Sequence, residues 1–250
     1  MPVRTVTART GGARGRRKRA PVAEVILRLD DAYGIPEWRP HRDPLAELVL
    51  TILSQNTSDA NSGRAFVRLL ERFPSWDDVA GAPLPEVIDA IQPGGLAPTK
   101  APRIQAVLRE VRERTGGYDL GFLAGLPLED ARAWLRALHG VGPKTVACVL
   151  LFALGRPAMP VDTHVFRVAT RLGLVPDRAG KAAMTAEKAH DLLERTVPEH
   201  DFYAFHIGLI KHGRRVCTAQ RPSCPGCVLR DLCPSALRFH PELGSHTRRP

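Results

Sequence analysis

Lys144 stands where a lysine could act as a nucleophile, in the first turn of a predicted helix directly after a glycine-rich turn. The positive end of the helix dipole disfavours an ammonium ion there, so we expect the pKa of Lys144 to be lowered toward the free amine. Farther along the chain, Asp162 precedes an amphipathic helix and offers a carboxylate. The structural alternatives are a lysine that is only a surface charge and an aspartate that only caps its helix.

The turn before the lysine is itself suited to binding. Gly140 and Gly142 bracket Val141 between helical patterns at 127–138 and 143–154. Glycines let the chain reverse at positive φ and let another backbone approach the amides, and the proline that opens the second pattern suits a first helical position. Such a turn exposes N–H groups at a helix N-terminus, where phosphate binds. The sequence therefore predicts a helix–hairpin–helix, which by itself indicates nucleic-acid binding rather than chemistry.

A group of cysteines near the C-terminus has the spacing of a metal site. Four cysteines follow the pattern Cys-x6-Cys-x2-Cys-x5-Cys: Cys217, Cys224, Cys227 and Cys233. No export signal supports disulfides in an oxidising compartment, so we predict one metal centre in a reducing compartment. Four thiolates suit zinc as well as an iron–sulfur cluster, although zinc sites more often pair two Cys-x2-Cys knuckles. We expect the fifth cysteine, Cys148, to be a buried core residue.

The segment from Leu138 to Lys144, followed by Val161-Asp162-Thr163-His164, resembles the endonuclease III branch of the helix–hairpin–helix DNA glycosylases. The resemblance implies that Lys144 is the nucleophile and AP-lyase residue and that Asp162 assists base loss. His139 stands where the family usually has proline. The cysteine spacing resembles the [4Fe–4S] loop of endonuclease III, which implies a [4Fe–4S] cluster as the cofactor held by the four cysteines.

The resemblance also implies a side chain that fills the hole left by a flipped-out nucleotide. The family has a glutamine in a Leu-Ser-x-Gln-x-x-Asp segment, and here Asn56 takes its place, with Gln55 one residue earlier. The structural alternative is a plain loop in which Ser54 and Asp59 cap helices. The expected DNA contacts are Gln55, Asn56, Gly140, Val141, Gly142, Thr145, His164, Lys211 and Arg214.

Composition and charge limit the class of protein. The chain has 250 residues, of which 44% are hydrophobic and 6% aromatic, and Ala and Leu at helical spacing indicate an all-α fold. No apolar run approaches membrane-spanning length and no secretory signal is recognisable, so we expect a cytoplasmic protein. The resemblance to DNA glycosylases implies that it is associated with the nucleoid. The net charge is +10. About +7 of it falls in residues 1–20, so bulk charge does not make the folded part a nucleic-acid binder.

The predicted helices and the resemblance together give two helical domains with an active-site cleft between them. We expect a disordered basic tail at 1–20, a helical barrel domain at 39–157 that contains the helix–hairpin–helix, and a C-terminal tail at 236–250. The iron–sulfur domain is expected to be discontinuous, formed by 21–38 and 158–235, because the family packs its first helix against the last ones. Helical patterns cover 21–32, 45–53, 60–73, 84–91, 100–115, 127–138, 143–154, 163–172, 181–196 and 199–212.

By resemblance, the expected function is base excision repair. The enzyme would remove oxidised pyrimidines from double-stranded DNA through a Schiff base on Lys144, act on abasic sites and nick the strand by β-elimination, as a monomer. One alternative is a glycosylase of the same superfamily for alkylated or mismatched bases. Another is a non-catalytic, cluster-containing DNA-binding protein, because the hairpin motif alone does not require an enzyme.

Overall fold

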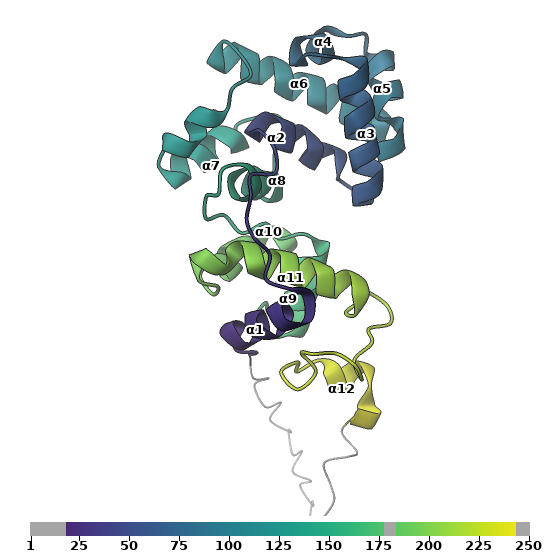
Figure 1. The fold of residues 1–250 in the computed structure, drawn as a ribbon, viewed down its shortest axis with the longest axis vertical. Coiled ribbons are helices and arrows are strands. Elements are labelled where there is room, and N and C mark those ends of the chain that lie inside the picture. Colours follow the sequence, from purple (N-terminus) through teal and green to yellow (C-terminus); the bar gives the residue numbers. More distant parts are fainter. Residues whose placement is uncertain (1–18, 178–183, 244–250) are drawn as a thin grey trace, which may run out of the picture.

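Helices make up the regular secondary structure of the described residues, 19–177 and 184–243, as the sequence predicts for an all-α fold. In this computed structural model the helices form two groups stacked along the long axis of the molecule (Figure 1). Most of the predicted basic tail lies outside the described residues. Within the described ranges, none of the helices is long and apolar enough to span a membrane.

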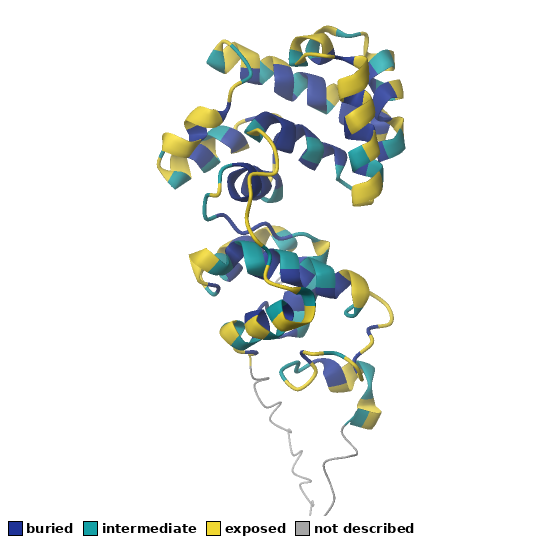
Figure 2. Cartoon of the chain, in the orientation of Figure 1, coloured by how far each residue is buried: buried dark blue, intermediate teal, exposed yellow. Residues whose placement is uncertain are grey.

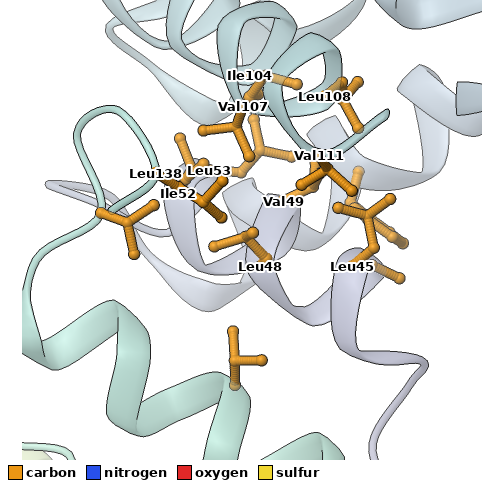
Figure 3. Packing of buried hydrophobic residues seen from close by; sticks show 14 of the residues in the cluster. Leu45, Leu48, Val49, Ile52, Leu53, Ile104, Val107, Leu108, Val111 and Leu138 are labelled. Atoms are coloured by element: carbon orange, nitrogen blue, oxygen red, sulfur yellow. The ribbon is translucent and has the colours of Figure 1, made fainter. Parts of the chain in front are cut away.

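The upper group in Figure 1 packs around α2, which is buried along most of its length (Figure 2). Leu48 and Ile52 of α2 lie in one core with Val107 of α6 (Figure 3). Each large apolar side chain buried in this way contributes about 1.5–3 kcal/mol. The group comprises α2 (Pro44–Leu53), α3 (Asp59–Arg72), α4 (Trp76–Gly81), α5 (Leu84–Ile91), η1 (Gln92–Gly94), α6 (Ala97–Thr115), η2 (Gly121–Gly125), α7 (Leu128–Arg136) and α8 (Pro143–Cys148).

The lower group brings together segments from opposite ends of the described chain, because α1 packs beside α11 (Figure 1). The two helices approach closely where Gly208 faces Leu29, since a Cβ on the glycine would lie 3.1 Å from the leucine Cβ. A larger residue there would push the two helices apart. The group comprises α1 (Val22–Tyr33), α9 (Thr163–Arg171), α10 (Ala186–Glu194), η5 (Glu199–Asp201), α11 (Phe202–Arg215) and α12 (Ala236–Phe239).

One helical segment belongs to both groups. Helix α8 runs directly into a π-helical turn, η3 (Val149–Ala153). Leu150 lies in the hydrophobic core of the upper group, whereas Cys148 and Leu151 lie in that of the lower group. The linker from α1 to α2 crosses this segment, and the Trp38 Nε1 donates a hydrogen bond to the Leu151 carbonyl at 2.8 Å. The predicted domain boundaries at 38/39 and 157/158 fall in the two connections between the groups and stay predictions.

The observed helices follow the predicted order, with differences at some ends. Helix α6 begins at Ala97 rather than at Lys100, directly after Leu96, which has a left-handed backbone conformation (φ 53°). The stretch at 236–250, expected to be a C-terminal tail, begins with α12. Its Phe239 ring centroid lies 4.4 Å from the Arg171 guanidinium carbon. Sequence periodicity does not show a helix of one turn that is held by such a cation–π contact.

Lys100 joins two elements of the upper group beside the loop that carries Gln55 and Asn56. Its Nζ donates to the carbonyl oxygens of Leu53 and Gly94 at 2.6 and 2.8 Å, and the residue is 3% exposed. A single buried ammonium therefore satisfies carbonyl groups at the ends of α2 and η1.

Replacing Lys100 by Met should lower the free energy of unfolding by about 2–4 kcal/mol, because two buried carbonyl groups lose their donor. Urea unfolding followed by circular dichroism measures this change. Lys188→Met, at an exposed position on α10, is the control and should change the stability by less than about 0.5 kcal/mol. Equal stability of the two variants would show that the carbonyl groups do not depend on Lys100.

Candidate active site

The turn between α7 and α8 has the predicted helix–hairpin–helix form, with one difference. Gly140 has φ 72°, in the left-handed region that favours glycine, whereas Gly142 is extended (φ −93°, ψ 174°) and stands at the N-cap of α8. The expectation of positive φ is therefore wrong for Gly142. The Val141 N–H bonds the Leu138 carbonyl at 3.2 Å. Among the described residues the N–H groups of Gly140 and Gly142 have no partner, so both are available to a phosphate.

Two side chains of α6 hold the hairpin in place. The Glu110 Oε2 accepts a hydrogen bond from the His139 N–H at 2.9 Å. Arg103 lies against Gly140, where a Cβ would come within 2.7 Å of the arginine Nε. The Arg103 Nη1 also donates to the Gln55 Oε1 at 2.8 Å. Arg103 therefore connects the hairpin to the loop that carries Gln55, and nothing in the local sequence of α6 indicates this role.

Lys144 lines a pocket of about 330 Å³ whose walls come from both helix groups. Gln55 and the hairpin lie in the upper group, whereas Val161, Glu187 and His190 lie in the lower group. The volume is in the range of pockets that bind small molecules. The predicted active-site cleft between two domains stays a prediction. The sequence motifs did not indicate Glu187 or His190, because α10 lies outside those motifs.

The charge on Lys144 differs from the expectation. Burial by itself lowers the pKa of this lysine, but the acidic side chains around it raise the pKa above the ordinary lysine value. Cys148, one helical turn onward, acts through its hydrogen bond with Lys144, and the carboxylates of Asp162 and Glu47 act through their charge. Lys144 therefore rests as an ammonium ion. The lowered pKa predicted from the helix dipole is wrong because these neighbours outweigh the dipole.

Asp162 both caps α9 and faces Lys144. Its Oδ1 accepts a hydrogen bond from the Val165 N–H at 2.7 Å, which is the capping role considered from the sequence. The same carboxylate is close enough to contribute to the raised pKa of Lys144. Asp162 also directly follows Val161, which lines the pocket. The Asp162 charge thus acts on Lys144, and capping and catalysis do not exclude each other.

The other predicted DNA contacts differ in their surroundings. Thr145 lines the pocket, although it is buried. His164 is hydrogen-bonded to an arginine of its own helix, and Lys211 donates to a backbone carbonyl at the end of α1. Arg214 forms two hydrogen bonds with Asp59, at 2.7 and 3.0 Å, and so links the lower group to the upper one. His164, Lys211 and Arg214 do not line the pocket, and their DNA contacts stay predictions.

Two residues of the upper group have a positive φ although they are not glycines. They lie on two loops that Lys100 connects through its hydrogen bonds. Asn56 (φ 54°) and Leu96 (φ 53°) are the non-glycine residues with positive φ in the described part of the chain. Asparagine tolerates this conformation well, which gives a physical reason for its presence at position 56. Leucine does not, and Leu96 is also 53% exposed. Such strain concentrates at functional sites, and no sequence pattern reveals it at Leu96.

The helix cap considered at Asp59 lies one residue earlier, because Ser58 is the N-cap of α3.

The four cysteines that follow α11 line one cavity. Two of their sulfur atoms accept N–H hydrogen bonds: Cys217 Sγ from the Arg171 Nη1 at 3.2 Å, and Cys227 Sγ from the Leu229 N–H at 3.4 Å. Such hydrogen bonds stabilise thiolate ligands. In the described ranges, no group of three or more His, Cys, Asp or Glu side chains is placed to hold a metal ion. The fifth cysteine, Cys148, is buried in the lower core, as predicted.

Comparison with known proteins identifies the class to which this fold and site belong. A family model of the HhH-GPD superfamily of base excision DNA repair proteins matches residues 49–195. The chain belongs to this superfamily and, within it, to the endonuclease III family.

Individual relatives agree with this assignment. The endonuclease III of Thermotoga maritima is 33% identical over 198 residues, which cover 79% of this chain and 86% of that protein. A putative DNA glycosylase of Arabidopsis thaliana is 42% identical over 171 residues, which cover 68% of this chain and 56% of that protein. A solved non-covalent complex of endonuclease III with DNA superposes with a TM-score of 0.74 at 29% identity, covering 87% of this chain and 95% of that one.

Asp162→Ala should lower the free energy of unfolding by about 1 kcal/mol, because the Val165 N–H loses its acceptor. Asp162→Asn should change it by only a few tenths of a kcal/mol, since asparagine caps helices about as well. Guanidinium unfolding measures both effects. If Asp162 acts through its charge, the Asn variant loses base removal at parental stability. Full activity of the Asn variant would limit Asp162 to capping.

Proposed function

We propose that this chain is a base excision repair DNA glycosylase with AP lyase activity. The observation that carries the proposal is the placement of Lys144 in a pocket, with the Asp162 carboxylate and the unpaired N–H groups of Gly140 and Gly142 beside it. The endonuclease III relatives support the same activity. So does the structure described as a trapped covalent intermediate of endonuclease III with DNA, which superposes with a TM-score of 0.71 at 30% identity.

The pocket would receive a nucleotide that has left the duplex. A base inside the stack cannot be attacked at its sugar, so the nucleotide must swing out. The N–H groups of Gly140 and Gly142 would then hold a backbone phosphate near the pocket. Asn56 would fill the space left in the duplex. Leu96, exposed on the neighbouring loop, would insert beside it, because apolar side chains can wedge between bases.

The chemistry would divide between the carboxylate and the amine. Loss of the base develops positive charge on the sugar, and Asp162 would stabilise that charge. Lys144, once it has lost a proton, would attack C1′ and form a Schiff base after the ring opens. Elimination of the 3′ phosphate would then nick the strand.

We propose an oxidised pyrimidine in double-stranded DNA as the substrate, an abasic site as a second substrate, and a monomer that acts at the nucleoid. Alkylated or mismatched bases are the alternative substrates. A panel of duplexes, each with one lesion, separates the two, because turnover of an alkylated purine without turnover of an oxidised pyrimidine would favour the alternative.

We also propose that the four cysteines hold a [4Fe–4S] cluster. The support is the shared cavity that they line and the N–H hydrogen bonds to two of their sulfur atoms. When bound, the cluster would fix the loop between α11 and α12 without taking part in base removal.

Lys144→Ala should abolish both strand nicking and covalent trapping by borohydride on an abasic duplex, because no amine remains to form the Schiff base. Gel electrophoresis of the labelled strand measures both products. Lys188→Ala, on the exposed face of α10, serves as the control and should leave both unchanged. Trapping that persists in the Lys144 variant would remove this residue from its proposed role.

Anaerobically purified protein should contain about four iron and four sulfide ions per chain. Cys227→Ala should lose most of the iron and unfold at a lower temperature, whereas Cys148→Ala, which changes the cysteine outside the cavity, should keep the iron. Elemental analysis and calorimetry provide these values. One zinc ion per chain, in place of iron, would exclude the cluster.

A further inference from the structure

The raised pKa of Lys144 creates a requirement that the proposed mechanism does not meet by itself. An ammonium ion has no lone pair, so Lys144 must transfer a proton before it can attack a carbon atom. A nearby side chain can accept this proton. The inference below rests on the proposed function, because it concerns the proton that Schiff-base formation displaces.

Most groups beside Lys144 are poor acceptors. Asp162 already uses Oδ1 to cap α9. Burial raises the pKa of the Cys148 thiol, so that at neutral pH it carries its own proton. Burial lowers the pKa of His206 to about 4, and its Nδ1 lies 2.8 Å from the Pro160 carbonyl oxygen.

Glu47 is a buried carboxylate with an oxygen that is free to accept a proton. It lies on α2, which packs against α8, and it is 4% exposed. Its Oε1 has only a long contact, 3.5 Å, with the Thr51 hydroxyl, and its Oε2 has no hydrogen-bond partner within the described ranges. An unsatisfied buried carboxylate oxygen is costly, so its retention calls for a reason other than stability. Helix α2 packs against α8, which carries Lys144 and Cys148, and the charge of Glu47 contributes to the raised pKa of both side chains.

We propose that Glu47 accepts the proton that Lys144 must lose and returns it when the Schiff base forms. In the first step the Lys144 ammonium and the Glu47 carboxylate become a neutral amine and a neutral carboxylic acid. The amine lone pair then bonds to C1′ of the open-chain aldehyde of an abasic site, giving a hydroxyl on that carbon. The Glu47 proton leaves with this hydroxyl as water, which yields the protonated Schiff base and restores the carboxylate. Glu47 thus takes a proton from Lys144 and gives it to the hydroxyl on C1′.

The surrounding charges predict how this transfer depends on pH. Burial raises the pKa of Glu47, whereas Arg42 and Lys144 lower it, and the net direction is upward. Below this raised pKa Glu47 is already protonated and accepts nothing, so Schiff-base formation should fall as the pH drops through it. Lys100, the buried cation of α6, donates to backbone carbonyls instead. The other ionisable groups that face Lys144 are Cys148, Asp162 and His206.

The test compares the parent with Glu47→Gln in single-turnover trapping on an abasic duplex, with cyanoborohydride present, between about pH 5 and 9. The amide keeps the size of the side chain but cannot take up a proton. We expect trapping at neutral pH to slow by at least about tenfold and the decline toward acidic pH to disappear. Glu113→Gln, at an exposed position on α6, is the matched control and should follow the parent. An unchanged rate and pH profile in Glu47→Gln would overturn the proposal.

Thermal unfolding separates this role from a structural one. Because Glu47 has an unsatisfied buried oxygen, Glu47→Gln and Glu47→Leu should unfold at or above the parental temperature and should bind an abasic duplex as the parent does. Slower trapping that accompanies lower stability and weaker binding in both variants would contradict the proposal. Failure of the parent itself to trap an abasic duplex would refute the proposed function, a different result from equal trapping by parent and variant.

Discussion

The placement of the nucleophile depends on a single helical segment that packs against two hydrophobic cores at once. Residues 143–153 begin at the hairpin, give Leu150 to the upper core, and give Cys148 and Leu151 to the lower one. Side chains packed in a core fix the rotation of a helix about its axis, so the residue at its first turn has a defined direction. Lys144 is therefore held at the pocket between the two groups, where neither core alone would place it.

The same arrangement explains why so many charged groups lie together in a mostly apolar region. Two cores meet at the pocket, and each contributes an acidic group: Glu47 from α2 in the upper group and Asp162 from the start of α9 in the lower group. Carboxylates that are buried near an ammonium lose hydration. The attraction between the opposite charges offsets this cost only in part. Stability alone would favour apolar side chains there, and chemistry gives a reason to keep the charges.

The sequence predicted well the features that depend on local pattern. Helix α5 has the predicted bounds, and the hairpin glycines lie between two helices. The four cysteines of the C-terminal loop line one cavity, and their metal centre stays a prediction. These features follow from periodicity, from glycine and proline, and from spacing within one segment. The family resemblance, which rested on the hairpin and the Val-Asp-Thr-His segment, is confirmed by the family match.

Features that depend on contacts between distant segments were not predicted. The helix dipole at Lys144 is local, as is the contact with Cys148 one turn onward, but Glu47 and Asp162 come from other elements and also raise the pKa. Glu47 lies in the segment 45–53, for which the sequence indicated only a helix. Arg103 and Leu96 stand out only through the hairpin packing and the backbone angle, which periodicity does not encode.

The most direct test of the account is to locate the covalent bond to DNA. An abasic duplex would be reduced with borohydride in the presence of the protein, and the cross-linked protein would be digested and mapped by mass spectrometry. The account predicts that the sugar remnant lies on Lys144 Nζ and that the other lysines are unmodified. A remnant on another lysine or on the terminal amine, with Lys144 intact, would contradict it.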